Sequence, residues 1–389
     1  QEGGTLEFRS VSPDINFATF INNGTVTYSM SGTAALGNFM TNANGLAVPD
    51  VNTYNNLIIS NPSGVTATTS IKSITGVLTV SDGSTLNTNG FVTLKSTAAK
   101  TATIAPIGTG VINGNVTVER YIPAGFRQYR LLSPATTGET INANWQENQA
   151  DGVDGNPGYG THITGAGGSA NGFDTTTSNA ASIFTYDNAI PAWTALANTS
   201  GTLTAGSPYL VYIRGSRLAT NIDASLGNDA TTLRTTGLLT IGTVNVTGLN
   251  ATANGFSIVG NPYQAQVDMN KVLVTNATAV NLTSFYYVVD PKLGGKGAYA
   301  TVDLVTPINS TAVDATQYLQ PGQACFVQTV ATSAASLNFT EADKFEGTQT
   351  SVFRTKNVAT ARLLLTLNDA YANALDRLVV AFDANETNA

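Results

Sequence analysis

Charged side chains, cysteine and histidine are all scarce in this sequence. Only 11% of its 389 residues are charged, against roughly 25% in ordinary globular chains. The single cysteine, Cys325, excludes an internal disulfide, and we expect it to be a small buried hydrophobic residue. With one histidine, His162, there are too few ligands for a zinc site built from clustered histidine and cysteine.

Two kinds of sequence segment are also missing. No apolar run approaches the ~20 residues that a membrane-spanning helix needs, so the chain is predicted not to span a membrane. The lysines and arginines do not form a cluster, and the formal net charge is −7. A nucleic-acid partner is therefore not expected, because such proteins present a concentrated basic surface.

The residues that are abundant favour β-structure. Valine, isoleucine, threonine, tyrosine and phenylalanine, which prefer strands, occur in short alternating runs bounded by glycine, asparagine, aspartate or proline. Helical periodicity is nearly absent, and only 141–147 and 267–274 are plausible helical turns. The sequence predicts an all-β protein, and its length indicates two or three structural units.

The first unit, residues 1–124, is predicted to be β-solenoid-like. Its short strands recur about every 15–25 residues, with glycine or asparagine at the corners, which is typical of stacked rungs. A β-sandwich remains the alternative. The strand segments are "GTVTYSM" (24–30), "YNNLIIS" (54–60), 74–96 and "GVINGNVTVERYI" (110–122).

Two related β-sandwich units are predicted to follow, over 125–248 and 249–389. Three landmarks recur in the same order in both, which indicates an internal repeat. They are "YRLLSPATTGETINANW" and "FSIVGNPYQAQVDMNKV", "SIFTYDNAIPAW" and "SFYYVVDPKLGGKGAY", and "LTAGSPYLVYIRG" and "LQPGQACFVQTVA". The second unit also includes two C-terminal strands within 361–389.

The first repeat carries a glycine-rich insertion, 151–174, within a predicted long loop over 146–174. We expect it to be a surface loop. Asp151, Asp154 and Asn156 are candidate calcium ligands, because calcium takes hard oxygen ligands from flexible loops. Their spacing does not match an EF-hand, and a solvated loop is the alternative. His162, in the same insertion, is predicted to have a local structural role.

No catalytic arrangement emerges from the sequence, so an enzyme is not predicted. No nucleophile-elbow motif is present, and the acidic residues are scattered. Asp187 and Asp290 occupy equivalent positions in the two repeats, where each is predicted to form a turn. A glycosidase would need two of the carboxylates in one cleft, roughly 5–10 Å apart.

Aromatic residues are the other candidates for function, because sugars bind on exposed aromatic faces. Trp193 and Tyr159 are the predicted ligand-binding residues. Alternation along strands buries about half of such side chains, so core packing is the competing interpretation.

Eight stretches that together span most of the chain carry a family resemblance. They are "YNNLIIS", "DGSTLNTNGFVTL", "GNVTVERYIPAGFRQYRLLSPA", "GYGTHITG", "GFDTTTSNAASIFTYDN", "AGSPYLVYIRG", "GFSIVGNPY" and "DRLVVAFD". These stretches resemble secreted and cell-surface proteins of Bacteroidetes that are exported by the type IX secretion system. The resemblance implies an extracellular location, the secretion machinery as a partner during export, and a sorting domain beyond Ala389. "DTT" (174–176) is similar to the O-glycosylation motif of this group, with Thr175 as the acceptor.

These observations predict a non-enzymatic surface protein, either an adhesin or a structural subunit of an extracellular fibre or coat. Its expected partners are copies of itself or a cell-surface polysaccharide, and calcium is the only cofactor considered. The alternative is a carbohydrate-binding module of a larger secreted, polysaccharide-acting protein. A hydrolase is the third hypothesis.

Overall fold

A computed structural model describes residues 4–9, 23–36, 52–223, 229–275, 279–291, 293, 297–306, 315–347, 361–368 and 374–382. It divides into two compact units, Gln1–Arg354 and Thr355–Ala389. Nearly all of its regular structure is β, so the predicted fold class is confirmed, including the solenoid at the N-terminal end.

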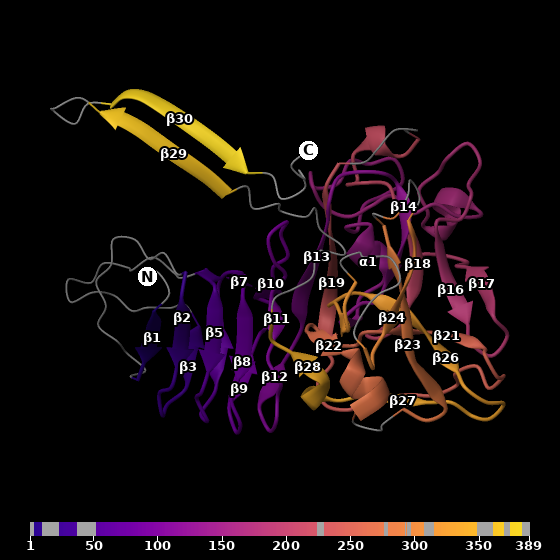
Figure 1. Cartoon of the computed structure of the whole chain (residues 1–389), viewed down its shortest axis with the longest axis horizontal. Helices are drawn as coiled ribbons and strands as arrows, with labels where there is room; N and C mark the ends of the chain where they lie inside the picture. The colour runs from indigo at the N-terminus through magenta and orange to yellow at the C-terminus, as the bar shows by residue number, and fades with distance from the viewer. Residues whose placement is uncertain are drawn as a thin grey trace. The chain divides into compact units, whose positions relative to one another are not determined.

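The described residues up to Ile122 form a β-solenoid of about four turns, with three sheets of parallel strands (Figure 1). Among the described residues, four turns each contribute one short strand to each sheet, and one further strand extends the first sheet. The first sheet contains β1 (Thr5–Phe8), β2 (Thr25–Tyr28), β5 (Asn56–Ile59), β8 (Val77–Val80) and β11 (Thr103–Ile104). The second contains β3 (Ala34–Leu36), β6 (Val65–Ala67), β9 (Thr85–Asn87) and β12 (Val111–Asn113). The third contains β4 (Thr53–Tyr54), β7 (Lys72–Ile74), β10 (Val92–Leu94) and β13 (Val116–Ile122).

The solenoid interior is built from ladders of apolar side chains. Val26, Leu57, Leu78 and Ile104 occupy matching positions on successive strands of the first sheet, and all four are buried. Each rung buries its inward residues against the rungs before and after it. This is why alternation with a period of two recurs at short intervals along the sequence.

Two four-stranded antiparallel sheets follow, and they have the same topology. The first sheet has the order β14-β18-β16-β17 and the second β21-β26-β23-β24, so corresponding strands occupy corresponding places. The three recurring sequence landmarks lie on these corresponding strands. The strands are β14 (Gln128–Leu132), β16 (Ile183–Asp187), β17 (Ala192–Ala195) and β18 (Tyr209–Ile213), and then β21 (Phe256–Gly260), β23 (Leu282–Asp290), β24 (Ala298–Asp303) and β26 (Ala324–Thr329).

Further strands complete the unit and join it to the solenoid. β19 (Thr231–Leu239) pairs with β13 of the solenoid along seven residues, so the third solenoid sheet continues into the first repeat. β15 (Thr136–Gly138) extends that sheet on the other side of β19. β20 (Val244–Val246), at the end of the first repeat, pairs with β27 (Leu337–Phe339) of the second. Within the second repeat, β22 (Gln266–Asp268) lies between β25 (Tyr318–Leu319) and β28 (Lys344–Phe345). One hydrophobic core extends from Ile122 to Phe339.

The two predicted helical turns have different outcomes. Residues 141–147 contain α1 (Ile141–Trp145), where the Thr140 hydroxyl accepts a hydrogen bond from the Ala143 amide and thereby caps the first turn. The prediction for 267–274 is right only in part, because it begins with β22 and continues as a single π-helical turn, η3 (Lys271–Thr275). Three short 3-10 turns are η1 (Gly168–Asn171), η2 (Ala219–Asn221) and η4 (Glu341–Asp343).

The glycine-rich insertion is not simply a surface loop, which corrects the prediction. Residues 151–154 are exposed, but Thr161, His162, Ile163 and Thr164 are fully buried. Gly165 lies against the ring of Phe173, where a Cβ atom would overlap the ring. The segment is irregular but packed, because its backbone bonds to strands and turns that follow later in the chain.

The second compact unit is a hairpin. β29 (Ala361–Asn368) pairs antiparallel with β30 (Ala374–Phe382), so the two strands predicted in this region are present.

Candidate functional site

An open cleft lined entirely by aromatic side chains lies where the two four-stranded sheets meet. Six residues line it and enclose a volume of about 330 Å³: Tyr186, Trp193, Phe256, Tyr287, Tyr299 and Phe326. We call it the aromatic cleft. Its rings come from strands of both repeats, so neither repeat alone contains the complete site.

The rings of the aromatic cleft are steeply inclined to one another. Phe326 is nearly buried and lies centrally, with its ring centroid 5.4 Å from that of Tyr186, 6.2 Å from Trp193 and 5.8 Å from Tyr299. The corresponding angles between ring planes are 89°, 88° and 69°. Tyr186 and Trp193 are 4.9 Å apart at 62°. Such edge-to-face pairs are favourable, and they produce walls around a floor rather than one flat surface.

Strand register identifies which cleft residues are equivalent in the two repeats. Tyr186 pairs with Trp193 across β16 and β17, and Val289 pairs with Tyr299 across β23 and β24. Trp193 and Tyr299 therefore occupy corresponding edge-strand positions. By the same argument Leu210, opposite Leu131, corresponds to Phe326, opposite Ile258.

Reciprocal contacts hold the two repeats together. Ser133 follows β14 and donates its hydroxyl to the carbonyl of Asn261, which follows β21. Asn188 binds both backbone groups of Ile258, donating to its carbonyl at 3.1 Å and accepting from its amide at 2.8 Å. Leu131, Ile258, Ala324 and Phe326 form a small apolar cluster between the sheets.

The repeated Leu-x-x-Gly motif contributes to this interface. Gly206 and Gly322 both have left-handed backbone angles, φ +78° and +74°. Gly206, in the first repeat, lies against Pro262 of the second. Gly322, in the second repeat, accepts a hydrogen bond at its carbonyl from the Ser133 amide of the first. The motif therefore allows the two repeats to approach each other closely. Glycine is favoured at both positions because a Cβ atom would strain the backbone at these φ angles.

The polar atoms of the aromatic cleft are few. The Tyr287 hydroxyl donates to the side-chain oxygen of Gln328 at 3.2 Å. Burial raises the pKa of Tyr186, Tyr287 and Tyr299, so these phenols remain neutral at physiological pH. Trp193, Phe256 and Tyr299 are 36%, 38% and 51% exposed, so the walls of the cleft are accessible from solvent.

The two predicted ligand-binding aromatics lie in different environments. Trp193 is a wall of the aromatic cleft. Tyr159 lies elsewhere, half-buried, with the guanidinium of Arg234 4.3 Å from its ring centre. Arg234 is in turn ion-paired with Glu147. One face of the Tyr159 ring is thus covered by a neighbouring side chain.

His162 belongs to a fully buried charged cluster that anchors the glycine-rich insertion. Asp174 accepts two hydrogen bonds from Arg217, at 2.7 and 2.8 Å, and further bonds from the Gln146 amide and the Ile163 backbone. His162 Nδ1 lies 3.3 Å from Asp174, and Nε2 donates to the Leu218 carbonyl at 2.9 Å. These contacts hold residues 162, 163 and 174 of the insertion against Gln146, Arg217 and Leu218, so we assign this cluster a structural role.

The three candidate calcium ligands bond to different parts of the chain. Asp151 accepts hydrogen bonds from the backbone and hydroxyl of Thr175, at 2.7 and 2.6 Å, whereas Asp154 accepts one from the Ala219 amide. Asn156 contributes its backbone carbonyl to the Tyr159 amide. In the described part of the chain no group of three or more His, Cys, Asp or Glu side chains could hold a metal ion.

Thr175, the candidate glycosylation acceptor, is exposed, but its hydroxyl donates to Asp151. The preceding residue of the motif, Asp174, is the buried carboxylate of the charged cluster.

Four acidic residues of the two repeats and the solenoid lie in separate environments. Glu119 is buried and ion-paired with Lys95, and Glu147 with Arg234. Asp187 accepts the amides of Ala189 and Ile190 and forms a turn, as predicted. Asp290 is fully buried at the end of β23, where its carbonyl accepts the Leu293 amide.

A second concave surface is polar. Fourteen residues line an open basin of about 840 Å³, most of them with amide or hydroxyl side chains. We call it the polar basin. Its rim includes Asp151, and it is bounded by the start of α1 and by η1. The lining consists of Thr140, Asn142, Asn148, Gln149, Ala150, Asp151, Ser169–Phe173, Asn198, Thr199 and Ser200.

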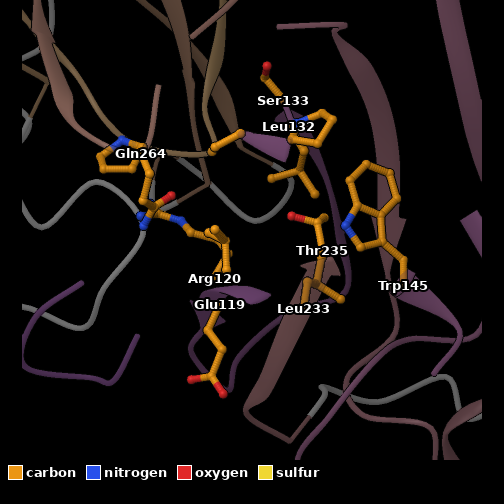
Figure 2. Close-up of a pocket in the computed structure, with 13 residues that line it drawn as sticks. Glu119, Arg120, Leu132, Ser133, Trp145, Leu233, Thr235 and Gln264 are labelled. Carbon is orange, nitrogen blue, oxygen red and sulfur yellow. The ribbon is translucent and has the colours of Figure 1, made fainter. Parts of the chain in front are cut away.

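A third cavity lies at the junction of the solenoid with both repeats and is too small for a ligand (Figure 2). Its volume is about 30 Å³, the space of a single water molecule. Figure 2 shows Trp145 and Leu132 close together on one side, and Arg120 and Gln264 approaching each other on the other. Gln264 donates to the Ala102 carbonyl in the solenoid. The cavity marks a packing junction.

Comparison with protein-family models, with curated proteins and with solved structures finds no match to this chain. Among the described residues, no helix has the length and apolar character required to cross a membrane.

Proposed function

We propose that this chain is a non-enzymatic protein of the bacterial cell surface, an adhesin that binds its target through the aromatic cleft. The solenoid acts as a rigid support for the two repeats, because β13 and β19 make one continuous sheet between them. The proposed extracellular location and type IX export are supported by the low content of charged residues and by the sequence resemblance.

One observation carries this proposal. The aromatic cleft exposes large apolar rings, three of them more than one-third accessible, in an otherwise strand-built protein. Exposed apolar surface is costly in water, and contiguous patches mark interaction sites. Aromatic side chains are also the residues that contribute most at binding hot spots.

The test compares the wild-type chain with a Trp193→Ala/Tyr299→Ala variant on panels of immobilised polysaccharides, lipids and extracellular-matrix proteins. We expect saturable binding to at least one class and its loss in the variant. The control is Tyr129→Ala, which removes a 38% exposed aromatic outside the cleft. If the variant binds like wild type, the cleft is not the binding site.

Electron microscopy of the native material tests the other part of the proposal. Separate particles are expected for an adhesin. Regular fibres or sheets, with no binding in the panels, would instead identify a structural subunit of a coat.

The polar basin favours a second candidate, a carbohydrate-binding module. Amide and hydroxyl side chains can replace the water molecules that sugar hydroxyl groups lose on binding. This candidate predicts glycan binding that Asn198→Ala weakens and Trp193→Ala leaves unchanged. Binding that depends on Trp193 alone would reject the basin as the site.

A further inference from the structure

We propose that the aromatic cleft recognises a quaternary ammonium group, a compact organic cation of the choline type. The inference rests on the proposed function, because it names the ligand class of the same site. It is drawn from the shape of the cleft, from the hydrogen bonds its lining can offer, and from the electrostatics of aromatic rings.

The shape of the cleft suits a compact group. A sugar ring stacks best on a flat aromatic platform, but here Tyr186 and Trp193 lie at 89° and 88° to Phe326. Tyr299 contributes a further wall, at 69°. Rings set around a floor in this way present several surfaces to one roughly spherical group such as a trimethylammonium.

The chemistry of the lining points in the same direction. Every lining residue is aromatic, and its hydrogen-bonding atoms are the tyrosine hydroxyls and the Trp193 indole N–H. A buried hydroxyl group without a hydrogen-bond partner costs free energy. A sugar with many hydroxyl groups would therefore bind weakly in this cleft. A quaternary ammonium has no N–H group and no acceptor, so it loses no hydrogen bond when it enters the cleft.

Charge then distinguishes a cation from a neutral apolar group. The faces of aromatic rings carry negative electrostatic potential, and they attract cations within about 6 Å. None of the six lining residues is charged, so no side chain of the lining competes for these faces. The formal net charge of −7 also favours the approach of a cation.

The same interaction already occurs elsewhere in this protein. Arg214 lies 5.0 Å from the ring centre of Tyr212, Arg234 lies 4.3 Å from that of Tyr159, and Lys344 lies 4.7 Å from that of Tyr263. At those sites the cation is a side chain. In the aromatic cleft we infer that the ligand supplies it.

The experiment titrates the full chain with choline and, separately, with 3,3-dimethylbutan-1-ol, in which carbon replaces the charged nitrogen. Intrinsic tryptophan emission provides the readout, because Trp193 is 36% exposed and Trp145 only 2%. We expect saturable choline binding at least about fivefold tighter than that of the neutral isostere. Equal affinities would overturn the proposal, as would the absence of saturable choline binding.

Variants assign the signal to the cleft. Tyr299→Ala should weaken choline binding by about fivefold, whereas Tyr129→Ala, outside the cleft, should leave it unchanged. Trp193→Phe retains a ring but leaves Trp145 as the only tryptophan, and the tryptophan emission of this variant should not respond. Circular dichroism spectra and thermal midpoints like those of the wild type would show that each variant is folded.

Vesicles distinguish the sources of the group. Capture by phosphatidylcholine vesicles but not by phosphatidylglycerol vesicles, with competition by choline, would identify a lipid head group. Choline binding without vesicle capture would identify a soluble or polymer-linked ammonium, and both results support the proposal. If choline fails but Trp193-dependent binding appears in the wider panels, the ligand class is wrong and the adhesin proposal stands.

Discussion

Asp174 shows most clearly how single residues stabilise this protein. Its carboxylate is fully buried and is bonded to Arg217, Gln146 and the Ile163 backbone. A buried charge is tolerated only when its partners replace the lost water. Because Arg217 is fully buried as well, neither charge can be removed without leaving the other uncompensated.

Asp174→Asn should therefore be strongly destabilising. The variant keeps the shape of the side chain but leaves the Arg217 guanidinium buried without a counter-charge, which costs about 3–5 kcal/mol. Denaturant unfolding would measure the change. Asp151→Asn is the control, because Asp151 is exposed and its loss should cost less than about 1 kcal/mol. Equal effects of the two substitutions would contradict this account.

The contribution of Asp174 should also depend on pH. Burial acts to raise the pKa of Asp174, but the hydrogen bonds from His162 and Arg217 outweigh it and lower the pKa to about 2. The stabilisation is present above the unfolded-state value near 4 and disappears as the pH falls through about 2. The stability difference between wild type and Asp174→Asn should shrink from pH 5 to pH 2. A constant difference would refute the assignment.

The thiol of Cys325 should be unreactive toward alkylating reagents in the native protein. It is fully buried on β26, and burial raises the pKa of its thiol well above the usual range. Thiolates, not thiols, react with alkylating reagents. We expect no modification by iodoacetamide under native conditions and complete modification in denaturant, both measured by mass spectrometry. Rapid native labelling would show that β26 opens readily.

At the scale of elements, the solenoid ladders set the stability of the N-terminal part. Leu78 lies between Leu57 and Ile104 in one ladder, and all three are buried. Leu78→Ala should cost about 2–5 kcal/mol, because neighbouring rungs cannot close the cavity completely. Thr79→Ala, the next residue on the opposite face of β8, should cost less than about 1 kcal/mol. Thermal and denaturant unfolding would compare them.

The stability of the protein should also depend on one glycine at the contact between the two repeats. A Cβ atom at Gly260, the last residue of β21, would overlap the Ser133 hydroxyl and the Gly206 carbonyl. Gly260→Ala should therefore destabilise the protein by about 1–3 kcal/mol or more through overpacking. Gly201→Ala, with no atom within 4 Å of the new methyl group, is the matched control. Similar stabilities of the two variants would exclude a tight interface.

The strands could be predicted from the sequence, but the burial of the insertion could not. Period-two alternation and corner glycines are local signals, and they located β2, β5, β8 and β13 and the recurring landmarks correctly. Residues 160–165 carry the glycines typical of an exposed loop. Their burial depends on Arg217, which is 43 positions beyond Asp174 and gives no local signal. Only the tertiary contact converts the loop into a packed segment.

At the scale of the whole molecule, β13 is a shared element. Its seven residues close the solenoid and also pair with β19 of the first repeat. Unfolding of the solenoid would therefore expose the edge of β19, and unfolding of the first repeat would expose the edge of β13. This continuity predicts that the solenoid and the repeats unfold together.

Tryptophan fluorescence provides a direct test of this cooperativity, because both tryptophans, Trp145 and Trp193, lie in the first repeat. Leu78→Ala, in the solenoid, should shift the unfolding midpoint seen by fluorescence as much as the midpoint seen by circular dichroism. If fluorescence does not shift while circular dichroism does, the solenoid unfolds independently.

The candidate site was predictable in part. Trp193 was identified from its residue type, and the internal repeat already indicated that two similar sheets exist. Phe256 and Phe326 could not be selected from the sequence, because alternation does not reveal which face of a strand meets another sheet. Tyr159 satisfied the same sequence criterion as Trp193, yet Arg234 covers one face of its ring.

The reciprocal contacts between the repeats have a consequence for the symmetry of the site. Surfaces that meet through equivalent residues are self-complementary, as in a two-fold homodimer. Two identical copies of one repeat would therefore form a symmetric pair. The two repeats of this chain differ, because the position that holds Phe326 in one copy holds Leu210 in the other. One chain with two different copies can thus form a single asymmetric cleft, which a symmetric pair would have to form twice or not at all.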